Sequence, residues 1–129
     1  MKTIKSMIIL VNDQQAALDF YTQKLGFVVK TDAIIGAGNR WLIINYLGQE
    51  NFEFALTLAV SEEAKSKVGK QLDEVNALFG VKTDNIEQDL ENFKKDGVKI
   101  KGDLINEPYG KFLFIEDLYG NGIYLHEEK

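Results

Sequence analysis

The sequence contains no cysteine, one histidine and one proline among its 129 residues. Without cysteine it has no disulfide scaffold, no thiolate metal centre and no cysteine nucleophile, and one histidine is too few for the imidazole-rich sites of zinc and iron. Neither a zinc finger nor a Ser-His-Asp triad can be assembled. Basic residues are also in deficit, with a formal net charge of -5. Nucleic acid is therefore a poor candidate partner, because affinity for a phosphate backbone comes from clustered Lys and Arg.

Long hydrophobic runs are missing as well. The apolar run Met7 to Val11 is shorter than the roughly 7 to 15 residues of a signal-peptide core. No segment approaches the ~20 apolar residues needed to cross a bilayer. We therefore expect no membrane partner and a cytoplasmic protein. The 45% of hydrophobic residues in a chain of 129 fits one globular domain with a real core.

What the sequence does contain is an internal repeat. At an offset of 72, positions Val11, Asn12, Asp13, Leu18 and Tyr21 correspond to Thr83, Asp84, Asn85, Leu90 and Phe93. At an offset of 71, the runs Arg40 to Ile44 and Phe52 to Phe54 correspond to Lys111 to Ile115 and Ile123 to Leu125. We divide the chain into module one (1–60), a polar connector (61–76) and module two (77–129).

Each module predicts a strand, a helix and three further strands. In module one an Ile- and Val-rich strand, Lys5 to Val11, precedes a helix that Asn12-Asp13 caps and Gly26 ends. In module two Asn85 is the helix cap, Gln88 could close a capping box, and Gly97 stops the helix. The later strands are expected at 27–31, 40–45 and 52–58, and at 98–100, 111–115 and 123–126.

Two tandem βαβββ modules, with Val-Asn-Asp before a helix ending Phe20-Tyr21-x-x-x-Leu25-Gly26-Phe27, resemble the vicinal oxygen chelate superfamily of glyoxalase I, bleomycin-resistance proteins and extradiol dioxygenases. Glu107-Pro108-Tyr109-Gly110 and Phe112-x-Phe114-x-x-Asp117 look like its closing strand pair. The resemblance implies an α+β, glyoxalase-like fold in which curled mixed sheets form a cup around a small molecule. It does not imply one activity, because such a fold carries several chemistries as well as non-catalytic binders.

The resemblance also implies four positions for metal ligands. They carry over to Ser6 and Glu53 in module one and to Leu78 and Tyr124 in module two. Only Glu53 is a usual ligand, so we expect that the metal site is lost and that no cofactor is bound. A shifted site that uses Glu53 and His126 is the alternative.

Strand alternation from those positions names the residues that face the cup. Together with the aromatic pocket positions that the resemblance implies, the expected ligand-binding set is Ser6, Ile8, Arg40, Trp41, Ile43, Glu53, Leu78, Tyr109, Phe112, Phe114, Tyr124 and His126. Alternatively, Trp41, Phe112 and Phe114 are plain core in a collapsed cup. His126, beside two glutamates, can also be read as a surface residue near the C-terminus.

Glu53 and Arg40 are the two charged residues with the clearest alternatives. A carboxylate between Phe52 and Phe54 is costly to bury unless it is paired, with a partner such as Arg40, or unless it tilts to solvent. Arg40 either clamps an anionic group of the ligand or forms a surface salt bridge.

The leading functional hypothesis is a metal-independent, homodimeric protein that binds a hydrophobic or aromatic, even cationic, small molecule in the manner of bleomycin-resistance proteins. The alternatives are a lyase or isomerase, with Glu53 as general base and Tyr124 as acid or oxyanion partner, and a metal-dependent protein with relocated ligands.

Overall fold

The computed structural model describes all residues from Met1 to Lys129, and the chain divides into two compact units, Met1–Val68 and Gly69–Lys129. Unit 1 contains β1 (Ser6–Val11), α1 (Gln14–Gln23), β2 (Val28–Ile35), β3 (Asn39–Asn45), β4 (Glu53–Leu58) and α2 (Glu62–Ser66). Unit 2 contains β5 (Phe79–Lys82), α3 (Ile86–Asp96), β6 (Lys99–Ile100), β7 (Ile105–Glu107), β8 (Gly110–Glu116) and β9 (Gly122–Glu128).

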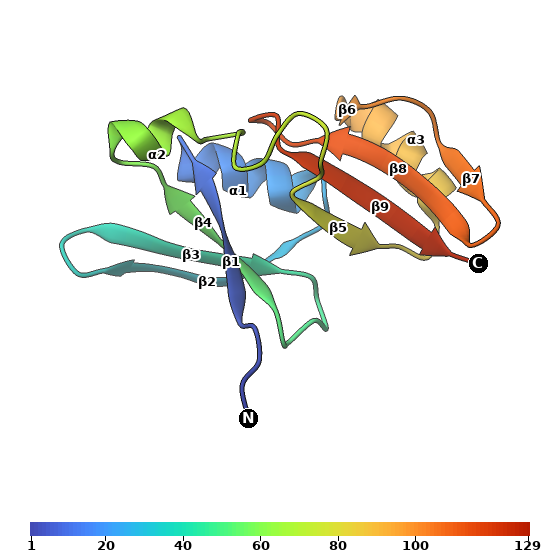
Figure 1. Ribbon diagram of the computed structural model, residues 1–129. Helices are drawn as coiled ribbons and strands as arrows, with labels where there is room; N and C mark the ends of the chain where they lie inside the picture. Colours follow the sequence, from blue (N-terminus) through green and yellow to red (C-terminus); the bar gives the residue numbers. More distant parts are fainter. The chain divides into compact units, whose positions relative to one another are not determined.

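Both units have the same strand connectivity. The first sheet has the order β1-β4-β3-β2, and the second has the order β5-β9-β8-β6 with β7 also paired to β8 (Figure 1). In each sheet the first strand runs parallel to the last strand of its unit, whereas the other pairs are antiparallel. The prediction of an α+β protein with two tandem βαβββ modules is confirmed. In unit 2 the second strand is interrupted, because β6 and β7 pair with successive parts of β8.

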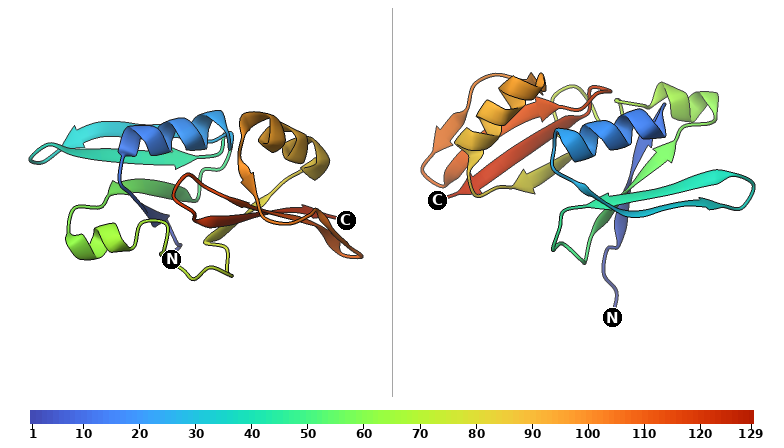
Figure 2. Two further views of the ribbon diagram at one scale, coloured as in Figure 1. Left: turned by 90° about the horizontal axis from the view of Figure 1, so that it is seen from above. Right: turned by 180° about the vertical axis from the view of Figure 1, so that it is seen from behind.

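One helix covers one face of each sheet. Figure 1 shows α1 beside the first sheet, while α3 lies behind β8 in Figure 1 and in front of it in the right-hand view of Figure 2. The side chains between each helix and its sheet are buried, and they form the core of each unit. In unit 1 they include Ile9, Val11, Leu18, Tyr21, Leu42, Ile44 and Leu56, and in unit 2 Ile86, Phe93, Leu113, Ile115, Ile123 and Leu125.

The predicted helix starts are confirmed. The Asp13 carboxylate accepts from Ala16 N at 3.0 Å, and the Asn85 side chain accepts from Gln88 N at 3.2 Å. Gly97 ends α3 in the left-handed conformation, with φ of 74°. The capping box is wrong, because the side chain of Gln88 instead donates to Asn92 one turn later.

The turn between β8 and β9 is held by a buried aspartate. Asp117 accepts from the backbone N–H groups of Tyr119 and Asn121 and from the side-chain amide of Asn121, all within 2.9 Å. Asp117 and Asn121 are both buried. This turn fixes the register of the two strands that carry Phe112, Phe114 and Tyr124.

None of the three helices has the length and the apolar character that crossing a membrane would require.

Candidate functional site

In each unit the sheet face that turns away from the long helix carries most of the predicted site residues. We call these faces the open face of unit 1 and the open face of unit 2. Because register partners point to the same side of a sheet, the strand pairing defines each set of residues. Each face is described by itself below.

The open face of unit 1 combines apolar side chains with one carboxylate. Ser6 pairs with Glu53 and Ile8 with Ala55, while Ile43 on β3 also pairs with Ala55. Trp41 lies two residues before Ile43 and therefore points to the same side. The predicted residues Ser6, Ile8, Trp41, Ile43 and Glu53 thus share one face. Trp41 is 43% exposed and Ile8 is 52% exposed, so Trp41 is not part of the core.

Glu53 is buried on this face, and its partner is Lys30. The Nζ atom of Lys30 donates to Oε1 of Glu53 at 2.9 Å, with the glutamate side chain 8% exposed and the lysine side chain 42% exposed. The sequence suggested Arg40 as the partner, which is wrong. Lys30 was missed, although it is the one charged residue within the predicted strand 27–31.

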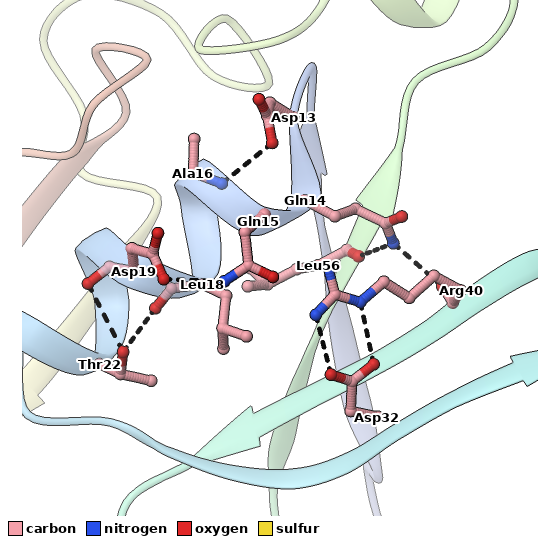
Figure 3. A network of polar contacts seen from close by, with 10 residues as sticks. All are labelled: Asp13, Gln14, Gln15, Ala16, Leu18, Asp19, Thr22, Asp32, Arg40 and Leu56. Carbon is pink, nitrogen blue, oxygen red and sulfur yellow. Dashed lines mark hydrogen bonds and ion pairs between the residues drawn. The ribbon is translucent and has the colours of Figure 1, made fainter.

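Arg40 lies on the other face of β3, because it alternates with Trp41. Its Nε and Nη2 atoms donate to the two carboxylate oxygens of Asp32 at 2.9 and 2.8 Å (Figure 3). This bidentate contact lowers the pKa of Asp32 and raises the pKa of Arg40. Arg40 therefore forms the salt bridge that was the alternative in the sequence, and it does not join Glu53 or Trp41.

Gln14, at the start of α1, connects two strands of the first sheet through its side-chain amide. Its Nε2 atom donates to the carbonyl oxygens of Arg40, at 3.0 Å, and Leu56, at 2.9 Å (Figure 3). Strands β3 and β4 pair only at Ile43–Ala55 and Ile44–Phe54. Beyond those pairs the glutamine amide bridges the two strands, so it satisfies carbonyl groups that the ladder leaves open.

The open face of unit 2 is a cluster of aromatic rings. Phe114 pairs with Tyr124 and Phe112 with His126, so all four residues point to one side. The ring of His126 stacks on that of Phe112 with centroids 4.2 Å apart and an interplanar angle of 9°. Tyr124 contacts both phenylalanines, and Tyr109 packs edge-on against Phe112. These predicted residues are brought together.

A cavity of about 420 Å³ opens onto this cluster. It is lined by Val75, Asn76, Ala77, Phe112, Phe114 and Tyr124. Phe112 and Phe114 therefore border empty space and are only half-buried, which distinguishes them from the core residue Leu113 between them. An apolar hollow with few polar groups is the usual form of a small-molecule site.

His126 is neither a simple surface residue nor a satisfied core residue. Its Nε2 atom is buried and has no hydrogen-bond partner. A methyl group at Gly110 would lie 2.3 Å from that atom, so the imidazole rests against the bare backbone of β8. His126 thus contributes a polar atom without a protein partner to the aromatic cluster.

A second, polar cavity of about 710 Å³ lies on the same unit and shares Asn76 with the first. Its lining includes Asp73, Lys101 and Glu116. Glu116 is held by Lys99 and Lys101, at 3.2 and 3.8 Å, and Lys101 also donates to the Glu74 carbonyl. The open face of unit 2 therefore has an aromatic end and a charged end.

The residues at the four implied metal positions do not fit a metal ion. Ser6 and Glu53 are register partners, but an ammonium group already occupies an oxygen of Glu53. In unit 2, Leu78 offers no donor side chain, and Tyr124 lies among aromatic rings. No group of three or more His, Cys, Asp and Glu residues could hold a metal. Divalent cations prefer several oxygen or nitrogen ligands of this kind.

Two tandem βαβββ modules, each with one helix-covered face and one open face, define the class of α+β proteins that are built from a duplicated module. The sequence model of the Glyoxalase/Bleomycin resistance protein/Dioxygenase superfamily matches residues 3–125, and the chain belongs to this family.

One relative and two solved structures are similar to this chain over nearly its whole length. An uncharacterized protein of Shewanella frigidimarina (strain NCIMB 400) is 30% identical over 121 residues, which cover 93% of this chain and 89% of that protein. The solved structure of UcmS2 is 26% identical, with a TM-score of 0.83 and 98% of each chain covered. TnmS3, an antibiotic binding protein from Streptomyces sp. CB03234, is 22% identical, with a TM-score of 0.78 and coverage of 100% of this chain and 98% of its own.

Proposed function

We propose that this protein binds a hydrophobic or aromatic small molecule without a metal ion, in the manner of a bleomycin-resistance protein. The observation that carries the proposal is the aromatic cluster of Phe112, Phe114 and Tyr124 on a cavity of about 420 Å³. Flat aromatic walls favour stacking with a ring system, and pairs of aromatic rings contribute about 0.5–1.5 kcal/mol beyond their buried area.

Two further observations support binding rather than catalysis. TnmS3, which has the same fold, is an antibiotic binding protein, and this is the kind of binding that we propose here. In addition, Oε1 of Glu53, the candidate general base, already accepts a hydrogen bond from Lys30. One of the two carboxylate oxygens of Glu53 is thus already engaged by a protein group.

The lyase or isomerase alternative requires Glu53 to work with Tyr124. Glu53 belongs to unit 1 and Tyr124 to unit 2. That the two residues act in one catalytic site is a prediction of this alternative. Glu53→Gln separates the two functions. An enzyme would lose turnover and keep its affinity for the ligand, whereas a binder would change only in affinity.

We also propose that the protein works as a homodimer in the cytoplasm. β2 is an edge strand, and its Ile34 and Ile35 are 69% and 47% exposed. Exposed apolar edges favour cover by another chain. Light scattering after size-exclusion chromatography measures the mass directly, and a monomer at micromolar concentration would contradict this part of the proposal.

A thermal-shift screen tests the proposed function. The panel contains polycyclic aromatic antibiotics, aromatic acids, thiol adducts and the divalent ions of Ni, Mn, Zn and Fe. We expect stabilisation by an aromatic compound that Phe114→Ala abolishes and that Leu118→Ala, on the turn outside the cavity lining, preserves. Stabilisation by metal ions alone would overturn the proposal.

A further inference from the structure

Lys30 is the extra residue of a β-bulge. Val29 pairs with Ile44 and Thr31 with Ile43, so the register between β2 and β3 shifts at Lys30 and leaves it without a partner on β3. Bulges redirect side chains, and they occur often next to functional sites. Here the side chain reaches across β3 to Glu53 on β4, with Nζ 2.9 Å from Oε1.

The two members of this ion pair differ in exposure. The Glu53 side chain is 8% exposed and the Lys30 side chain 42% exposed. A buried carboxylate needs a charged partner, and Lys30 provides it. The ammonium group of Lys30 has three N–H donors. Glu53 is the one protein group that accepts a hydrogen bond from it. Donors of Lys30 therefore remain available to a ligand on the open face of unit 1.

Apolar surface lies on the same face. Trp41 and Ile8 are 43% and 52% exposed there, whereas Ile43 on the same face is buried. A cationic ligand would face the ammonium of Lys30, while the negative charge of Glu53 is already neutralised. A ligand oxygen, in contrast, would gain a charge-assisted hydrogen bond.

We infer that Lys30, held in place by Glu53, is the polar anchor of a ligand site on the open face of unit 1 and takes the place that the resemblance implies for a metal ion on that face. The ligand class that fits is an aromatic or apolar compound with a carboxylate, phenolate or carbonyl oxygen. This inference rests on the proposed function, and it replaces the cationic ligand that the leading functional hypothesis allowed. The ammonium also explains why Glu53 and Ser6 do not suit a divalent cation.

Calorimetric titration with three naphthalene probes tests the inference. The probes are 2-naphthoate, 2-naphthalenemethanol and 2-naphthylmethylammonium, which share the ring and differ in charge. We expect the protein to bind the naphthoate about tenfold or more tightly than the ammonium probe, the ratio that one charge-assisted hydrogen bond supplies.

Variants of Lys30 identify the source of that preference. Lys30→Met should remove it and leave the affinity for the neutral alcohol within about twofold, whereas Lys30→Arg should retain it. Lys24→Met is the matched control: it makes the same change in charge at the end of α1, where Lys24 lies over the ring of Phe20. The double variant Lys30→Met/Glu53→Gln avoids an unpaired carboxylate, so that a folding defect of the single variant does not decide the result.

The outcomes separate the two proposals. Equal affinity for all three probes, or a preference for naphthoate that survives in Lys30→Met, would overturn the role of Lys30 and leave the proposed function standing. Absence of binding by every probe would instead contradict the proposed function, and the inference about Lys30 would fall with it.

Discussion

Gly80 makes room for the ring of Tyr124. The two residues are register partners on β5 and β9, and a methyl group at position 80 would lie 2.1 Å from Cζ of Tyr124. The phenol ring therefore lies against bare backbone, a close approach that glycine permits within a strand. Because Tyr124 lines the aromatic cavity of unit 2, Gly80 helps to set the shape of that cavity.

Gly80→Ala should weaken ligand binding more than folding. The added methyl group displaces the outer end of a ring that is 36% exposed, and alanine is less costly than glycine in a strand. We expect a change below about 1 kcal/mol in the free energy of unfolding and a loss of about 2- to 10-fold in affinity for the aromatic compound that the thermal-shift screen identifies, in line with one aromatic contact. Urea unfolding and calorimetry measure the two quantities. If the substitution weakened binding equally in a Tyr124→Ala background, the ring would not be the cause.

Gln14→Leu should destabilise the protein by about 2 kcal/mol, because it leaves the carbonyl groups of Arg40 and Leu56 without their donor. Gln15→Leu is the matched control, since the exposed Gln15 side chain donates only to Asp19 on the same helix. Its effect should stay within about 0.5 kcal/mol. Equilibrium unfolding in urea gives both values, and equal effects of the two substitutions would disprove the bridging role of Gln14.

The Asp32–Arg40 pair should make a small, pH-dependent contribution to stability. The Arg40 guanidinium lowers the pKa of Asp32 below its ordinary value of 3.8. A carboxyl group with a lower pKa in the folded state stabilises the protein above the unfolded pKa and loses this contribution as the pH falls through the folded pKa. Both side chains are partly exposed, so solvent weakens the effect.

Melting temperatures of the wild type and Asp32→Asn should therefore differ most near neutral pH and converge as the pH falls below about 4. Asp103→Asn, at an exposed position, serves as the control for the loss of one negative charge. A difference between wild type and Asp32→Asn that grew on acidification would contradict the ion pair.

The periodic features of the sequence predicted much of the fold. Asp13 and Asn85 are recognisable as helix caps because a cap acts on the N–H groups of the next few residues. The resemblance and the repeat offset placed Trp41 and Ile43 on the face of Ser6 and Glu53, and the strand register agrees with that placement. Such patterns depend on residues that are close together along the chain, and each pattern occurs in both modules of the repeat.

The partners of the charged residues could not be predicted in this way. Glu53 was expected to find Arg40, but alternation turns Arg40 to the opposite face, where Asp32 holds it. Lys30 reaches Glu53 only because a bulge in β2 changes the register by one residue. Nothing in the local sequence specifies that bulge, since the pairing of two strands determines it.

The sequence by itself thus determined the βαβββ repeat, the family and the aromatic character of the open face of unit 2, because these depend on local patterns and on composition. The tertiary structure decided that Lys30 neutralises Glu53, that Gln14 bridges β3 and β4, and that Tyr124 lies over Gly80. Each of these contacts joins residues far apart in the chain. Their geometry depends on strand register and on a bulge, which form only when the sheets assemble.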